Sequence, residues 1–280
     1  MSDASKPLVG APECVTDDHT FVPAYDWRLD PEVGYEGDPD GKSLRMRHYH
    51  QHLWSMRPLS GQPGGPCLVL KPRGTGLMDT ALDQDFFGKG SGLYLSSDRT
   101  MATWWRWRET EQLRQDSALM GRILQANPVL DGMGGTMLWP GWEVNGGSIN
   151  QARGFGAERL RIADRLDLTV ECIRLFYAKV RDQERNPLGP TFVRYEQFFD
   201  LFDGFDEFVD FWLLRDLVSD DGERVVFLME GDIPEYDFTT RRPFPTTETE
   251  YDRYLDNALE LVGRRNDRMT AVWSALDLPS

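Results

Sequence analysis

The sequence predicts a single α+β domain, in which a small, mostly antiparallel sheet packs against several helices, including a central buried helix. Short apolar runs bounded by glycine and proline alternate with apolar patterns of helical spacing, and no repeat of fixed period is visible. With 280 residues, of which 40% are hydrophobic and 12% aromatic, the chain can bury a substantial core. We therefore expect one domain over residues 23–280, preceded by a flexible tail over residues 1–22.

The central helix is expected at residues 164–180, the most hydrophobic helical segment of the chain. Leu166, Val170 and Ile173 recur at the spacing of one helical face, and a second apolar set lies on the opposite side. A helix covered on two sides cannot leave its charged residues unpaired, so we expect ion pairs along the polar stripe between the faces. That stripe consists of Asp167, Glu171, Arg174 and Arg181.

The other elements follow from capping and turn signals. Suitable N-caps are Ser43, then Ser97 or Asp98, and finally Thr246 or Thr247. Stretches rich in glycine and proline separate the apolar runs. These signals predict helices at 44–55, 97–127, 192–202, 205–218 and from Thr246 or Thr247 to 275, and strands at 67–71, 93–96, 136–139 and 224–229.

Charge and composition exclude several classes of protein. A formal charge of -15 and a pI near 4.7 argue against nucleic-acid binding, which needs a clustered basic surface. No window of about 18 apolar residues and no signal-peptide pattern is present, so we expect a cytoplasmic protein without membrane association. The 3 cysteines are widely spaced and do not indicate a disulfide framework. Basic residues are mostly arginine, which indicates a bacterium of high GC content or its phage.

Three of the four histidines lie on the helix expected at 44–55. His48 and His52 share a face, but two histidines do not make a zinc site and no HExxH or CxxC pattern adds ligands, so no metal site is predicted. His50 is followed by Leu53 and Trp54, and an apolar neighbourhood would keep it neutral. It is a candidate catalytic residue, with a hydrogen-bonded structural histidine as the alternative.

A polar loop at 140–156 connects an expected buried strand to the central helix. Its polar side chains include Asn150, Gln151 and Arg153, a combination of donors and acceptors typical of the polar side of a ligand pocket. We therefore predict that these three residues line the main pocket, with His50 close enough to share it. The alternative is that Arg153 reaches back to Asp164 or Asp167 and fastens the loop to its helix.

Several motifs together resemble a family of bacterial proteins known only as a domain of unknown function. The most specific are Ile149–Gly154 (INQARG) and Asp164–Arg174 (DRLDLTVECIR), supported by Tyr49-His50, Leu53–Ser55 and Leu95–Asp98. The similarity covers about residues 26–270. It implies one α+β domain and brings no established activity.

A local similarity points toward chemistry. The run Phe87–Gly90, the strand Gly92–Ser96, and then Ala102 and Trp105 look like the glycine, strand and small-residue pattern at the NAD site of ADP-ribosyltransferases. The first-strand motif of that family needs a His-Gly pair that is absent around Leu53–Ser55, so the similarity is confined to the later pattern.

That resemblance implies an NAD-using or other nucleotide-using transferase. Tyr94 would stack on nicotinamide, Ser96 and Arg73 would hold ribose or phosphate, and either Glu143 or Glu230 would polarise the ribose 2′-hydroxyl. A carboxylate is needed because departure of nicotinamide builds positive charge at the anomeric carbon. NAD is the expected cofactor, and a small-molecule or nucleotide ligand the expected partner.

Two other functions stay open from the sequence. A non-enzymatic protein-binding module would use tryptophans as anchors in an aromatic interface, and a metal-dependent hydrolase or nuclease would use histidines with nearby carboxylates. The residues concerned are Trp104, Trp105, Trp107 and Trp142 for the interface, and His48 and His52 for the metal.

Overall fold

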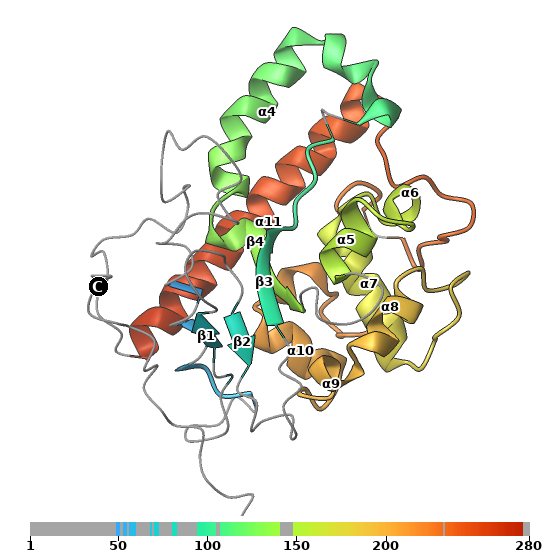
Figure 1. Cartoon of the computed structure of the whole chain (residues 1–280). Helices are drawn as coiled ribbons and strands as arrows, with labels where there is room; N and C mark the ends of the chain where they lie inside the picture. The colour runs from blue at the N-terminus through green and yellow to red at the C-terminus, as the bar shows by residue number, and fades with distance from the viewer. Residues whose placement is uncertain are drawn as a thin grey trace, which may run out of the picture.

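The computed structural model describes residues 49–50, 53–54, 56–59, 68, 70–72, 80–82, 94–104, 107–140, 148–231 and 233–276, and for 70–72, 80–82 and 94–99 it describes the backbone alone. The tail expected at 1–22 lies outside these residues. The described part is mostly helical, with a long C-terminal helix crossing the molecule and a group of shorter helices on one side (Figure 1).

The expected α+β class is wrong. Eight α-helices occur in the described residues, whereas the strands there are three to six residues long. Residues 224–229, expected to form a strand, make only isolated bridges, Val218 to Val225 and Phe227 to Gly231. Within them, helix side chains satisfy the backbone of Leu228, because Asp167 accepts from the Leu228 N–H and Asn257 donates to the Leu228 carbonyl. This apolar run covers helices and does not extend a sheet.

The strands pair antiparallel in chain order. They are β1 (Leu70–Pro72), β2 (Thr80–Leu82), β3 (Tyr94–Arg99) and β4 (Thr136–Pro140). Every residue of β4 is buried, and its position agrees with the strand expected at 136–139. The longest register joins β3 to β4, from Leu95 opposite Pro140 to Arg99 opposite Thr136.

The prediction of a helix at 97–127 is also wrong for the first half of that range. β3 continues to Arg99, and Trp104 takes a positive φ of 48°, which a right-handed helix does not contain. The helix begins only at α4 (Ser117–Leu130), where the carboxylate of Asp116 accepts from the backbone N–H groups of Ala118 and Leu119 at 2.8 and 2.9 Å.

Six helices form a group beside β3 and β4 (Figure 1). They are α5 (Ile149–Gly154), α6 (Arg159–Ile162), α7 (Leu166–Tyr177), α8 (Gly189–Arg194), α9 (Glu196–Phe199) and α10 (Phe205–Phe211). The prediction of a buried helix is confirmed in α7, where Leu166–Ile173 are all buried. Clustered rings of Phe176, Phe192, Phe199 and Phe208 join it to the later helices.

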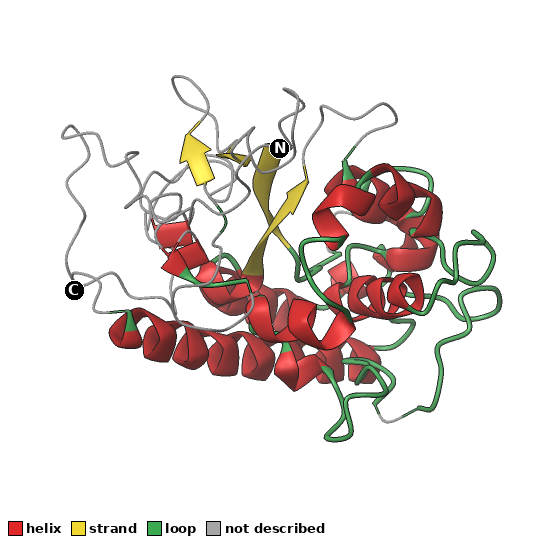
Figure 2. Cartoon of the chain, turned by 90° about the horizontal axis from the view of Figure 1, so that it is seen from below, coloured by secondary structure: helices red, strands yellow, loops and turns green. Residues whose placement is uncertain are grey.

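Helix α11 (Glu248–Ala275) is the long helix at the bottom of Figure 2. The expected cap is confirmed: Thr247 and Glu250 form a reciprocal capping box. The helix packs along α4 and against the turn at Met133–Gly135, where a Cβ on Gly134 would lie 2.6 Å from the Val262 carbonyl oxygen. Only glycine allows so close an approach. None of the helices in the described residues combines the length and apolar character needed to span a bilayer.

Candidate functional site

The candidate site is built on a buried cluster of charge at the start of α7. Arg165 is the N-cap of this helix and has extended backbone, which sends its side chain into the core. Its guanidinium donates to Asp167 (Nε to Oδ1 3.1 Å, Nη2 to Oδ2 2.5 Å) and to both oxygens of Glu230 (2.9 and 2.6 Å). Two acidic residues 63 positions apart (230 − 167) are thereby joined by one arginine.

The electrostatics of this cluster keep Arg165 charged. Burial alone would lower the pKa of Arg165, but the charges and hydrogen bonds of Asp167 and Glu230 outweigh it and hold that pKa above its ordinary value. The side chains of Arg165 and Asp167 are 0% exposed and that of Glu230 is 9% exposed. Glu230 is therefore the member of the cluster that meets the surface.

Glu230 opens into a cavity of about 360 Å³, here called the Glu230 pocket. The first turns of α11 and the preceding segment build it. Its lining residues are Met229, Glu230, Ile233, Arg241, Arg242, Phe244, Thr246, Glu250 and Arg253. The volume is at the lower end of the range of about 300–1,000 Å³ found for small-molecule sites.

The carboxylates of the Glu230 pocket are already engaged by the protein. Glu230 is held by Arg165, and Glu250 accepts from the backbone N–H of Thr246 (2.7 Å), which is the main reason that the pKa of Glu250 is lowered. The guanidinium groups of Arg241 and Arg242 have no hydrogen bond or ion pair to any described residue. The charged groups of the pocket that no described residue pairs with are therefore cationic donors.

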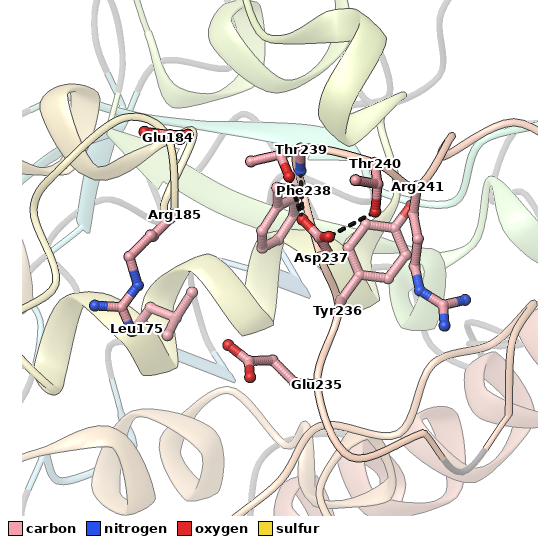
Figure 3. Close-up of a pocket in the computed structure, with 10 residues that line it drawn as sticks. All are labelled: Leu175, Glu184, Arg185, Glu235, Tyr236, Asp237, Phe238, Thr239, Thr240 and Arg241. Atoms are coloured by element: carbon pink, nitrogen blue, oxygen red, sulfur yellow. Dashed lines mark hydrogen bonds between the residues drawn. The ribbon is translucent and has the colours of Figure 1, made fainter.

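A second cavity, of about 430 Å³, is lined in part by the same segment (Figure 3). We call it the Asp237 cavity. Leu175, Glu184, Arg185 and Glu235–Arg241 line it, and Arg241 belongs to both cavities. The Asp237 carboxylate accepts from Thr239 and Thr240, so it shapes the turn and its pKa falls to about 2.

Arg153 lies outside both cavities and is 0% exposed. It donates to the Asp164 carboxylate (2.6 Å), to the Asp164 and Thr100 carbonyls (2.8 and 3.1 Å), to Thr169 Oγ1 (3.0 Å) and to Asn150 Oδ1 (3.3 Å). The contact with Asp164 is the one expected if Arg153 fastens the loop to its helix, which is the alternative that the sequence left open. These bonds engage every branch of the guanidinium, so they favour that role over ligand binding.

The other loop candidates are divided between different places. Asn150 is half-buried and accepts from Arg153, whereas Gln151 lines a third cavity of about 330 Å³ together with Glu158, Gln183 and Arg194. Among the described cavities, none is lined by all three loop residues.

His50 is 1% exposed and lies in the core. The indole N–H of Trp54 can only donate, so His50 Nδ1 accepts it (2.9 Å) and Nε2 carries the proton toward Thr136 Oγ1 (3.2 Å). Burial, with a smaller contribution from the charge of Arg265, lowers the pKa of His50 to about 3. Both nitrogens of this neutral imidazole are engaged by core residues, and neither described cavity near Glu230 is lined by it.

Several predicted residues lie outside the described part or are described by their backbone alone. Arg73 and Glu143 lie outside the described residues, as do His48 and His52. Tyr94 and Ser96 lie in β3, where only the backbone is described, opposite Ala81 and Trp139.

The alternative functions depend on residues that are buried or outside the described part. Trp104 is 2% exposed and donates to the Ala163 carbonyl, and Trp107 is half-buried, so neither is an exposed anchor, while Trp105 and Trp142 lie outside the described residues. Among the described residues, no group of three or more His, Cys, Asp or Glu side chains could hold a metal ion.

Sequence reasoning singled out Glu230 but missed its surroundings. The stripe prediction is confirmed for Glu171 and Arg174, which form two hydrogen bonds of 2.7 Å. Asp167, however, pairs with Arg165 from outside the stripe. The available signal for the pocket was the pair Arg241-Arg242 directly before the proline-rich approach to α11.

In the comparison with protein families, the model of a family of unknown function (DUF6994) matches residues 22–269. Neither the curated proteins nor the solved structures provide a match.

Proposed function

The chain belongs to DUF6994, a family of unknown function, and from its site we propose that the Glu230 pocket binds a phosphate-bearing nucleotide. The observation that carries the proposal is which of the charged side chains in the pocket are paired with other protein groups. Three arginines line the pocket, both of its glutamates are engaged by the protein, and two of the arginines have no partner among the described residues. Guanidinium groups are planar forks of donors that match phosphate oxygens.

The third arginine of the pocket, Arg253, is held by a hydrogen bond and can also contribute to phosphate binding. Arg253, in the second turn of α11, donates to the carbonyl of Met229 at 3.4 Å, and both residues line the pocket. The pocket also lies at the N-terminal end of a 28-residue helix, where the helix dipole favours negative charge. An anion is therefore favoured here although the whole chain carries a charge of -15.

Glu230 can serve a ribose hydroxyl without leaving Arg165. A carboxylate has about four acceptor positions, and Arg165 uses one on each oxygen. The remaining positions can accept from a hydroxyl group. Met229, Ile233 and Phe244 provide the apolar part of the lining for a base.

NAD is the first nucleotide to test, because Glu230 is one of the two glutamates that the resemblance to ADP-ribosyltransferases implies. In a transfer reaction its carboxylate would hold the 2′-hydroxyl while positive charge develops at the anomeric carbon. Binding and transfer are separate claims. An assay for nicotinamide release tests the second one only after binding has been measured.

The binding claim is tested by thermal unfolding with inorganic phosphate, ADP and NAD. A ligand at about 100 times its Kd stabilises a protein by about 2.7 kcal/mol, so ADP or NAD should raise the Tm of the wild type. The Arg242→Gln protein should show a normal Tm alone and a much smaller shift with nucleotide. Arg264→Gln, on the same helix as Arg253 but outside the pocket, is the matched control and should respond as the wild type does. Equal shifts in both variants would contradict the proposal.

A further inference from the structure

The Asp237 cavity adjoins the Glu230 pocket, and we infer that it is a second subsite that holds the other half of a dinucleotide. The inference rests on the proposed function of the Glu230 pocket. Arg241 lines both cavities, so its side chain is within reach of a ligand in either one. With volumes of about 360 and 430 Å³, each cavity suits one nucleotide half, and the two together suit an elongated ligand.

Tyr236 lines one cavity and lies close to the arginine that holds Glu230 in the other. Its ring lies 5.8 Å from the guanidinium carbon of Arg165, the arginine that holds Glu230 in the neighbouring pocket. It lines the Asp237 cavity and is 2% exposed, yet its hydroxyl has no hydrogen-bond partner among the described residues. Burial raises the pKa of Tyr236, so the hydroxyl stays protonated and can donate. Buried hydroxyls are nearly always bonded, so the Tyr236 hydroxyl is a donor in a residue that lines this cavity, and no described residue satisfies it.

The rim of the Asp237 cavity provides further donors. Arg185 and Arg241 lie on opposite sides of it (Figure 3), both side chains are exposed, and neither guanidinium is paired within the described residues. Glu184 and Glu235 add acceptors for hydroxyl groups, while Leu175 and Phe238 provide apolar contacts. Cationic donors, carboxylate acceptors and an apolar floor match the phosphate, ribose and base of a nucleotide.

The walls of this cavity are fixed to each other by Arg161 on α6. Its guanidinium donates to the Phe238 carbonyl (3.3 Å) on one wall, and to the carbonyls of Gln183 (2.6 Å) and Glu184 on the other. One side chain therefore holds two loops that are more than fifty residues apart in sequence. A cavity whose walls are joined in this way is preorganised for a ligand.

The test compares the Kd of AMP with the Kd of NAD by calorimetry on the full chain. If the second half of a dinucleotide occupies the Asp237 cavity, NAD should bind the wild type about tenfold more tightly than AMP, and this ratio should fall toward one in Tyr236→Phe and in Arg185→Gln. Tyr236→Phe removes only the hydroxyl and keeps the buried ring, and Arg185 is on the surface, so both variants should fold. Arg264→Gln should keep the wild-type ratio.

The outcomes are distinguishable. AMP binding with no gain for NAD, or a ratio unchanged in both variants, overturns the second subsite and leaves the proposed function in place. Failure of AMP and NAD alike to bind overturns the proposed function and the second subsite together.

Discussion

Arg165 is held between two carboxylates, of which Asp167 is 0% exposed and Glu230 is 9% exposed. Its replacement by methionine would leave two buried or nearly buried negative charges facing each other. Removal of one partner of a buried ion pair typically costs about 3–5 kcal/mol. We expect Arg165→Met to lower the free energy of unfolding by about that amount in urea titrations.

The matched control for this prediction is Arg174→Met. Arg174 makes an equally short ion pair with Glu171, but its side chain is 26% exposed, so water can replace it. The control should therefore lose less stability than Arg165→Met. Equal losses would show that burial of the Arg165 cluster does not govern its energetic role.

His50 should make the stability of the protein depend on pH below neutrality. Its pKa in the folded protein is about 3, against an ordinary value of 6.5 in the unfolded chain. As the pH falls below 6.5, the unfolded state binds a proton that the folded state does not, so the free energy of unfolding decreases by up to about 1.4 kcal/mol per pH unit. His50→Gln should reduce this slope between pH 6.5 and 5. A variant with the wild-type slope would mean that His50 titrates normally in the folded protein.

At the scale of elements, the N-terminal cap of α11 should be a measurable source of stability. Thr247 Oγ1 accepts from the Glu250 N–H, and the Glu250 carboxylate accepts from the Thr247 N–H in return. Thr247→Ala should lower the free energy of unfolding by about 1 kcal/mol. Thr249→Ala, in the same helical turn but outside the capping box, is the control and should change stability by a few tenths of a kcal/mol at most.

The elements that local patterns determine were predictable, and those that depend on distant partners were not. The buried faces of α7 depend on residues that are close together in the sequence, and so does the cap of α11. Residues 224–229 have the apolar pattern of a strand, but Asp167 and Asn257, far away in sequence, satisfy the backbone of Leu228 within them. Glu230 could be proposed from the sequence. Its pairing with Arg165 could not, because Arg165 lies 65 positions earlier in the chain.

At the scale of the whole molecule, α11 covers a large part of the core. It packs along α4, supplies buried residues from Tyr251 to Trp273, and sends the fully buried Arg265 to the carbonyls of Gly134 and Thr136 (2.9 and 2.6 Å). We expect a chain that ends at Arg241 to lose cooperative thermal unfolding. A sharp unfolding transition in that truncated chain would contradict the expectation that residues 23–280 fold as one domain.

The central claim is that the arginines of the Glu230 pocket bind nucleotide phosphate, and a crystal structure of the full chain with ADP tests it most directly. The account predicts phosphate oxygens within hydrogen-bond distance, about 2.7–3.2 Å, of Arg241, Arg242 or Arg253, with a ribose hydroxyl facing Glu230. Density for ADP at another place on the molecule, or an empty Glu230 pocket at saturating ADP, would contradict it.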